Sequence, residues 1–123
     1  SDEKTPTVEQ LRKGWQPHKE KIRSLSVAKN KPIIFTEYGY RSNNYTAKKP
    51  WLVDHSQDDV NLEAQTNATK AIFEEFWKEV WFAGGFVWKW FIDHEKAGGV
   101  NDNRFTPQNK PAQEVIKSFY KIH

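Results

Sequence analysis

The sequence contains neither cysteine nor methionine among its 123 residues. Without cysteine, neither a disulfide framework nor a thiolate metal site can form. Because not even position 1 is methionine, we expect the chain to begin inside a longer translated product. No apolar run approaches the ~20 residues that a membrane-spanning helix needs, so we expect no membrane as a partner.

Charge of one sign is scarce as well. The 19 Lys and Arg residues are interspersed with 16 Asp and Glu residues, which leaves a formal net charge of +3. Because no block of like charge stands out, we expect a solvated surface and no nucleic acid as a partner. The four histidines show no spacing typical of a metal site, so no metal is predicted; they are His18, His55, His94 and His123.

Aromatic residues, in contrast, are abundant at 15% of the chain, and six of them are tryptophans. They cluster at residues 73–90 and 119–120. Aromatic side chains are ordinary core material, but tryptophan also stacks on the apolar faces of sugar rings. The composition is therefore compatible with a globular protein that binds carbohydrate.

The first predicted element is a helix over about residues 5–30. Thr7 and Gln10 form a capping-box pair at its start, and Asn30 is typical of a helix end. Pro17 lies inside this stretch, so we expect a break or kink near residues 15–16.

The rest of the chain alternates between strand and helix patterns. Ile33, Ile34 and Phe35 are consecutive apolar residues, which is typical of a strand buried on both faces in a parallel sheet. Ala83-Gly84-Gly85 is expected to end the second helix, and Pro111 fits the first position of the last one. The predicted elements are a strand at 31–40, a polar loop at 41–60, a helix at 61–81, a strand at 85–92, a loop at 93–109 and a helix at 110–122.

This alternation indicates parallel βα units. We therefore predict two adjacent parallel strands, with the loops at 41–60 and 93–109 at the same end of both. Two strands are too few to cover three amphipathic helices, so the chain is predicted to be a piece of a larger α/β fold.

Glu37 is the main catalytic candidate. It ends an apolar strand and precedes Gly39 and the long polar loop. Barrel enzymes place catalytic groups at this end of their strands, and a carboxylate there can attack an anomeric carbon to form a covalent glycosyl-enzyme. The alternative is a buried structural Glu that pairs with an arginine or caps the loop, and position alone does not separate the two.

The local sequence around Glu37 favours the catalytic role. Residues 31–40, KPIIFTEYGY, resemble the seventh-strand motif of the clan A glycoside hydrolases, and residues 85–90, GFVWKW, resemble the eighth. Further similarities extend over nearly the whole chain: KPW at 49–51, Gln65, AGGFVWKW at 83–90 and FTPQNKPAQEVIKSFY at 105–120. Together they resemble glycoside hydrolase family 113, whose known activity is mainly that of an endo-β-1,4-mannanase.

The resemblance implies an α/β fold that is the C-terminal segment of a TIM (β/α)₈ barrel, from helix 6 to helix 8 and including strands 7 and 8. It implies a retaining hydrolase with Glu37 as the nucleophile, a β-linked polysaccharide or oligosaccharide as the substrate, and no cofactor. The acid/base of this clan is a Glu at the end of strand 4, which this chain does not contain. The segment alone is therefore expected to be inactive without the remainder of its own barrel. A secreted or periplasmic location is expected from the same resemblance.

Five aromatic residues are candidates for substrate binding. Trp88 and Trp90 are expected to share one strand face, with Trp88 under the sugar at the cleavage site and Lys89 directed toward the helices. Packing in the barrel core is the alternative for both tryptophans. The other candidates are Tyr38, Tyr40 and Trp51.

Trp51 and Arg41 each leave two interpretations open. The loop residue Trp51 is predicted either to form a distal sugar subsite or to pack against a neighbouring loop. Arg41 is expected either to contact Glu37 and keep it ionised or to be solvated.

Two other classes of function stay open on the sequence. One is a non-catalytic carbohydrate-binding relative that keeps the groove and has lost the chemistry. The other is a half-barrel module that assembles with copies of itself.

Overall fold

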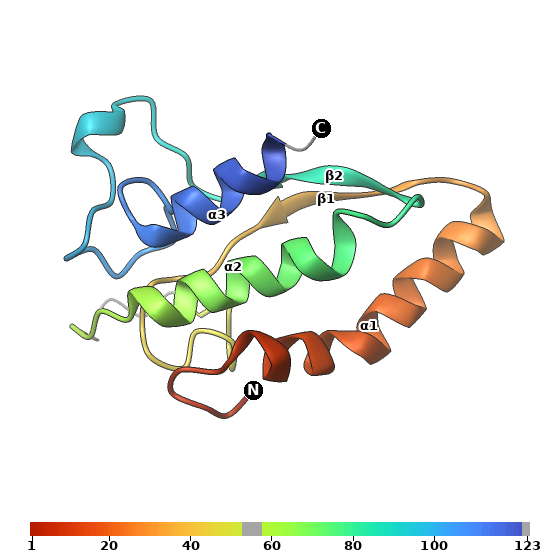
Figure 1. Cartoon of the computed structure of the whole chain (residues 1–123), viewed down its shortest axis with the longest axis horizontal. Helices are drawn as coiled ribbons and strands as arrows, with labels where there is room; N and C mark the ends of the chain where they lie inside the picture. Colours follow the sequence, from red (N-terminus) through yellow and green to blue (C-terminus); the bar gives the residue numbers. More distant parts are fainter. Residues whose placement is uncertain (53–57, 122–123) are drawn as a thin grey trace.

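The computed structural model describes residues 1–52 and 58–121. Three helices alternate with two strands, and a short 3₁₀ turn follows the second strand (Figure 1). The elements are α1 (Val8–Lys29), β1 (Ile33–Tyr38), α2 (Leu62–Phe76), β2 (Phe82–Val87), η1 (His94–Lys96) and α3 (Pro111–Tyr120). Within these described ranges, no helix is both long enough and apolar enough to cross a membrane.

α1 begins and ends where the sequence predicts. Thr7 and Gln10 form the capping box, and Asn30 ends the helix in the left-handed conformation, with φ of 49°. The predicted break at Pro17 does not occur, because the helix continues through this residue. Proline removes one hydrogen bond and crowds the preceding turn, which bends a helix without necessarily ending it. Figure 1 shows the ribbon of α1 changing direction partway along its length.

β1 and β2 are adjacent and parallel, which confirms the predicted pairing. β2 begins at Phe82 and ends at Val87, so the prediction of 85–92 is displaced. α2 likewise ends at Phe76, before the predicted 81. Both limits differ from the prediction because Gly84 and Gly85 lie inside β2 and do not end α2. A Cβ at Gly85 would lie 3.0 Å from Tyr38 Cδ1 and 3.1 Å from Phe35 Cβ, so glycine here permits close contact with β1.

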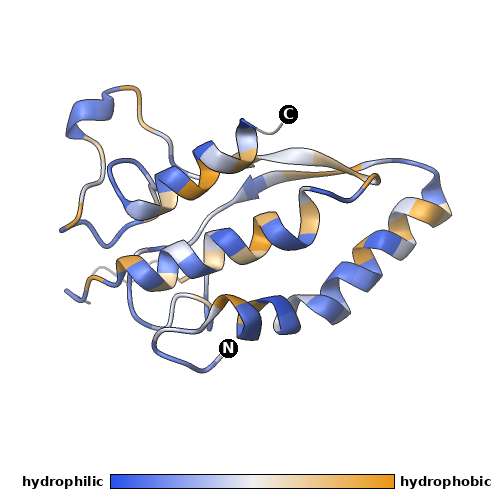
Figure 2. Ribbon diagram, viewed as in Figure 1, coloured by the Kyte–Doolittle hydropathy of each residue, from blue (hydrophilic) through white to orange (hydrophobic). Residues whose placement is uncertain are grey.

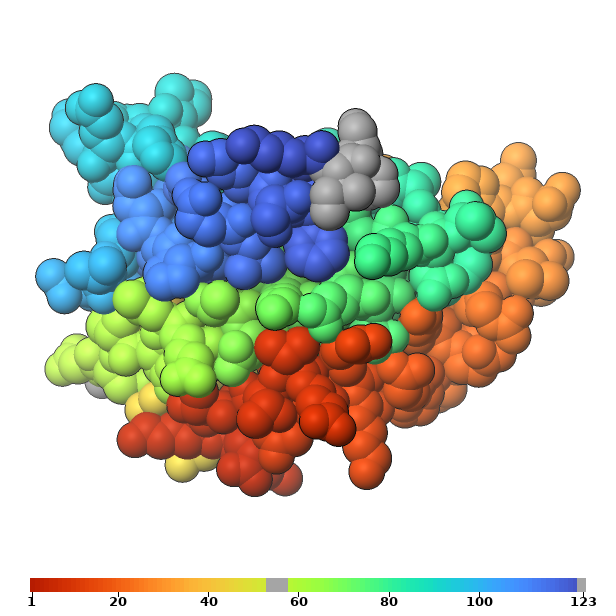
Figure 3. All heavy atoms as spheres, in the orientation of Figure 1, coloured from red at the N-terminus to blue at the C-terminus, as the bar shows by residue number. Residues whose placement is uncertain are grey.

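The three helices form one layer over one face of the sheet, with α2 between α1 and α3 (Figure 3). Figure 2 shows hydrophobic segments recurring along α2 and α3, whereas α1 is hydrophilic over most of its length. The core lies between the helices and the sheet and is largely aromatic. Its buried members are Tyr38, Ile72, Phe73, Phe76, Phe82 and Ile116.

The opposite face of the sheet is open. Ile34 is 50% exposed and Phe86 is 65% exposed, so the described residues cover only one face of the two strands. The reason is that, in the described ranges, all three helices lie on one side of the two-stranded sheet.

α1 is held on α2 by a buried charge as well as by apolar contacts. The Glu75 carboxylate is buried and accepts hydrogen bonds from Arg12 Nε at 2.7 Å and Lys19 Nζ at 3.1 Å. Burial alone would raise the pKa of Glu75, but the hydrogen bonds from Arg12, Gln16 and Lys19 outweigh it and lower the pKa. The two helices are therefore fixed to each other by an ionised group.

Candidate active site

Glu37 lies on the open face of the sheet, one residue before the end of β1. Phe35 and Tyr38 both face the helices, where Phe35 contacts Phe76 and Tyr38 contacts Phe73. They are three residues apart, which regular alternation forbids, and the strand register is irregular between them. This irregularity leaves both Thr36 and Glu37 exposed. The carboxylate is therefore accessible at the carboxyl end of the strand.

The loops that follow the two strands meet at this same end, as the sequence predicts. Ser42 lies at the start of the loop after β1, and its N–H donates to Arg104 O at 3.2 Å. The Ser42 hydroxyl donates to Asp102 O at 2.6 Å. The two loops are thus joined directly beyond the strand that carries Glu37. Residues 53–57 of the first loop lie outside the described residues.

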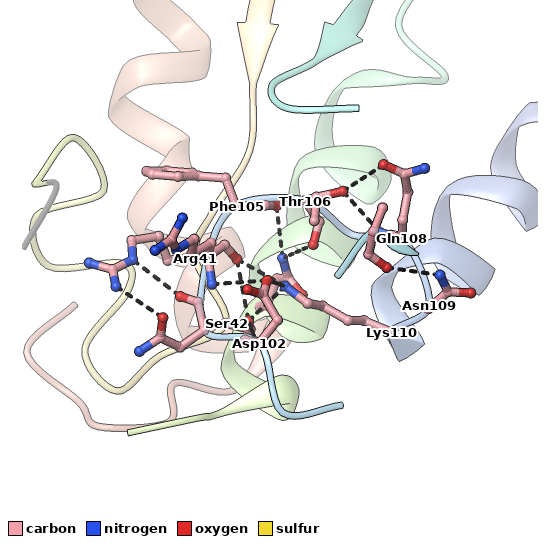
Figure 4. A network of polar contacts seen from close by, with 12 residues as sticks. Arg41, Ser42, Asp102, Phe105, Thr106, Gln108, Asn109 and Lys110 are labelled. Carbon is pink, nitrogen blue, oxygen red and sulfur yellow. Dashed lines mark hydrogen bonds and ion pairs between the residues drawn. The ribbon is translucent and has the colours of Figure 1, made fainter. Parts of the chain in front are cut away.

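Lys110, the residue before α3, ties these loops together with a buried ammonium group (Figure 4). Its Nζ donates to Ser42 Oγ at 3.0 Å, to Arg104 O at 3.0 Å and to Asp102 Oδ2 at 2.7 Å. Burial lowers the pKa of Lys110, although the neighbouring Asp102 carboxylate acts in the opposite direction. Sequence reasoning missed this residue, because nothing local distinguishes it from a solvated lysine.

Two buried glutamine amides fix the backbone around the site. Gln65 Nε2 donates to Tyr40 O and to Phe105 O, each at 3.0 Å, which joins the loops after both strands. Gln108 Oε1 accepts from Phe91 N at 2.7 Å, and its Nε2 donates to Phe91 O at 3.0 Å. The Gln108 amide therefore pairs with Phe91 as a neighbouring strand would, and it holds the segment that follows β2.

Trp88 lies at the end of β2 beside the last residues of β1. Its N–H donates to Tyr38 O at 2.7 Å, and its side chain is 38% exposed. A Cβ on Gly39 would meet Trp88 Cβ at 3.4 Å, so the two strand ends are in contact. This places the backbone of Trp88 next to the strand that carries Glu37.

Trp90 has a different environment from Trp88. The predicted common strand face is wrong, because β2 ends at Val87 and Lys89 adopts a positive φ of 66° that turns the chain between the tryptophans. Trp90 stacks on His94 with ring centroids 6.2 Å apart, and it borders a groove between β2 and α3. Lys89 was also predicted to point away from Trp88, toward the helices. Its Nζ instead lies 4.4 Å from the centroid of the Trp88 ring, so this prediction is wrong as well.

The two tyrosines lie largely inside the molecule. The Tyr38 side chain belongs to the core, and its hydroxyl is 2.9 Å from the hydroxyl of the exposed Tyr120. Burial raises the pKa of Tyr38 and raises that of Tyr40 to about 12. The register irregularity explains why Tyr38 faces the helices, and this location gives no support to a contact between Tyr38 and substrate.

The two loop candidates differ in their exposure to solvent. Trp51 is 73% exposed and borders an open cavity that also includes Trp15 and Tyr40. Arg41 is buried and donates to Asn103 O at 3.2 Å, so the prediction of a solvated side chain is wrong. A buried guanidinium is stable here because it has hydrogen-bond acceptors in the second loop.

Three solved structures with a similar fold are β-mannanases of one family. A GH113 β-1,4-mannanase solved as a complex has a TM-score of 0.74 and 21% sequence identity, covering 97% of this chain and 37% of its own. A second, the GH113 β-mannanase of Alicyclobacillus acidocaldarius in complex with ManMIm, has a TM-score of 0.73 and 26% identity over 95% of this chain. A third GH113 β-1,4-mannanase has a TM-score of 0.70 and 23% identity over 91% of this chain.

The chain spans only 36–37% of the length of these mannanase chains. No curated protein sequence matches it. The model of Glycoside Hydrolase Family 113 matches residues 4–110, a range that includes β1, β2, Glu37 and Trp88. On this match over most of its length, the chain belongs to glycoside hydrolase family 113.

Proposed function

We propose that this chain is the C-terminal segment of the barrel of a retaining endo-β-glycanase that hydrolyses β-1,4-mannan, with Glu37 as its nucleophile. One observation carries the proposal. An exposed carboxylate lies one residue before the end of a parallel strand, and a tryptophan directly follows the adjacent strand beside it. Membership of family 113 and the mannanase structures with the same fold support the choice of substrate.

The proposed reaction is a double displacement. A Glu37 carboxylate oxygen bonds to the anomeric carbon while the bond to the leaving sugar oxygen breaks, and an acid elsewhere in the barrel protonates that oxygen. The partner acid, now deprotonated, then acts as a base and removes a proton from water. The resulting oxygen bonds to the anomeric carbon, and Glu37 leaves the sugar as a carboxylate. Trp88 lies beside the strand that carries Glu37, and we assign it the apolar platform under the ring.

The partner acid is assigned to a part of the protein outside this chain. Retaining hydrolysis requires a second carboxyl group about 5 Å from the first. The open sheet face and the sheet's free strand edges need covering by further strands.

A groove of about 520 Å³ runs beside β2 and α3, bordered by Phe86, Val87 and Ile116. A second cavity, of about 580 Å³, lies between α1 and Tyr40, which follows β1. We propose that neighbouring strands of the same barrel fill both.

Replacement of Glu37 by alanine in the complete barrel protein tests this function. Turnover of β-mannan should fall by several orders of magnitude, whereas the melting temperature should hardly change, because a side chain at the carboxyl end of a barrel strand faces the substrate groove rather than the packed core. With an activated aryl β-mannoside, azide can attack from the vacated face and yield the α-mannosyl azide. A β-mannosyl azide would instead reassign Glu37 to the acid/base role.

A matched control is Thr36→Ala, which shortens the neighbouring exposed side chain on the same strand. It should retain most of the activity. Full activity of Glu37→Ala would end the proposal.

Glycan binding without any hydrolysis by the unaltered complete protein would favour the non-catalytic carbohydrate-binding relative. Assembly of the 123-residue chain with copies of itself into a discrete oligomer would favour the half-barrel module.

A further inference from the structure

β1 carries one more residue than β2 at the end of the sheet where Glu37 lies. β1 takes three residues to advance from Phe35 to Tyr38. The paired stretch of β2, from Gly85 to Val87, takes two. An extra residue on one strand is a β-bulge, which bends that strand and can turn a side chain toward the other face. Bulges are frequent next to active sites for this reason.

The bulge decides which way Glu37 points. Phe35 packs against Phe76 of α2, so regular alternation would direct Glu37, two residues later, toward the helices as well. Its carboxylate would then lie in an aromatic core, where an unpaired charge is costly. With the bulge, Glu37 is exposed and Tyr38 takes the place in the core. The orientation of Glu37 therefore depends on what keeps Tyr38 inside.

The ring of Tyr38 is one part of that anchor. The residue is 6% exposed, and its ring meets Phe73 and Trp77 edge to face, at centroid distances of 5.7 Å and 5.4 Å. A Cβ on Gly85 would lie 3.0 Å from the Tyr38 ring and 3.1 Å from Phe35 Cβ, so the residues on both sides of the bulge pack over one glycine. A return to regular alternation would expose the Tyr38 ring and break these contacts.

The hydroxyl of Tyr38 is the second part. It is 2.9 Å from the hydroxyl of Tyr120, the last residue of α3, and the Tyr120 hydroxyl also donates to Gly85 O at 3.5 Å. Because the Gly85 carbonyl can only accept, Tyr38 is the donor to Tyr120. Burial raises the pKa of Tyr38, and the bond to Tyr120 acts in the same direction, so this proton is retained. The bulge is thus tethered to α3 and to β2.

We propose that Tyr38 is a positioning residue, whose buried ring and hydroxyl bond to Tyr120 hold the bulge that turns Glu37 out of the core. Its carbonyl accepts from Trp88 N–H at 2.7 Å, so the same residue also fixes the strand end that carries Trp88. The effect on catalysis rests on the proposed function, in which Tyr38 acts through Glu37. The effect on the orientation of side chain 37 does not rest on it.

Steady-state kinetics of the complete barrel protein test the effect on catalysis. Tyr38→Ala removes the ring, and kcat on manno-oligosaccharides should fall by about 100-fold, since a displaced nucleophile is costly. KM should change little, because the residues that bind the glycan remain. Tyr38→Phe and Tyr120→Phe each remove the hydroxyl bond and should lower kcat by roughly fivefold. The double variant should lose no more than either single one, because all three lack the same bond.

Phe82→Ala is the matched control. Phe82 is 9% exposed and belongs to the same core, but it pairs with Ile33 at the opposite end of β1. Its replacement should lower the melting temperature about as much as Tyr38→Ala and leave the kcat of the folded protein unchanged. An equal loss of kcat for both would show that Tyr38 acts through stability alone, which would overturn the proposal. The two phenylalanine variants keep the core filled, and an unchanged kcat in both would refute the tether.

A labelling experiment tests the orientation without any activity. Glu37→Cys places a thiol at a known position, because the chain has no cysteine of its own, and alkylation at that peptide is followed by mass spectrometry. Cysteine packs well in cores, so only the bulge keeps this side chain accessible. Adding Tyr38→Ala should slow the labelling several-fold, whereas adding Phe82→Ala should not. Unchanged labelling would overturn the proposal. Slowed labelling in a protein that hydrolyses no glycan would refute the proposed hydrolase and leave the role of Tyr38 standing.

Discussion

The two faces of the sheet differ in what covers them and in what their side chains do. On the helix face, Phe82 and Tyr38 are buried, and they pack edge to face against Phe35 and Phe73, respectively. On the open face, Ile34 and Phe86 are half exposed or more, and the accessible Glu37 lies among them. The helix face thus accounts for the stability of the chain, whereas the open face carries the group that we assign to chemistry.

A substitution on each face of β2 gives the largest contrast. Phe82→Ala should lower the free energy of unfolding of the 123-residue chain by about 3–5 kcal/mol, because it empties a buried ring position. Phe86→Ala should change it by less than about 1 kcal/mol, because the ring is exposed. Both values follow from urea unfolding. In the complete barrel, the Phe86 substitution should become costly as well, and an equally small effect there would contradict the barrel.

Lys110→Met should have the next largest effect. It removes a buried ammonium and leaves the Asp102 carboxylate without its closest partner, at a cost of roughly 2–4 kcal/mol. Because Lys110 joins both loops, amide hydrogen exchange at Ser42 should accelerate more than exchange within α2. The exposed Lys121→Met is the control. Uniform acceleration across the chain would show that Lys110 supports the fold as a whole rather than the loops.

Glu75→Gln tests the charge between α1 and α2. Loss of its ionised hydrogen bonds should lower the free energy of unfolding by about 1.5–3 kcal/mol at neutral pH. Because the pKa of Glu75 is lowered in the folded chain, its stabilisation is complete above its unfolded pKa of about 4.3 and is lost as the pH falls through the folded value. The stabilities of the two proteins should therefore converge in acid. A constant difference down to low pH would contradict the ionic origin.

The smallest effects concern two glycines. Gly14 lies in α1, and a Cβ there would meet nothing within 4 Å, so Gly14→Ala should stabilise the chain by about 0.5–1 kcal/mol. Gly85→Ala should destabilise it by about 1–3 kcal/mol, since the new methyl group would press on Tyr38 and Phe35. Thermal melting of both variants measures the difference in sign. A stabilising Gly85→Ala would show that β1 and β2 are further apart than described.

The sequence was sufficient for the order of the elements, for the parallel pairing and for the placing of both loops at the end that carries Glu37. These follow from apolar runs and caps, which act locally. The limits of β2 did not follow, because glycine occurs both at helix ends and where strands approach closely, as at Gly85. The environment of Tyr38 depends on an irregular register, and the turn after Trp88 depends on a left-handed lysine.

The polar network around Lys110 was beyond sequence reasoning for another reason. Its partners Ser42 and Asp102 come from two different loops, and their proximity is a product of the tertiary fold. Its burial is equally a tertiary property, which no local pattern of residues reports.

The most direct test of the account is to trap the covalent intermediate in the complete barrel protein. An activated 2-deoxy-2-fluoro-β-mannoside slows hydrolysis of a glycosyl-enzyme, so the sugar stays attached to the nucleophile. Proteolysis and mass spectrometry should then find the fluoromannosyl group on the peptide from β1, esterified to Glu37. The Glu37→Gln protein should remain unlabelled. Labelling of any other carboxylate, while Glu37 stays free in an active protein, would contradict the assignment of Glu37 as the nucleophile.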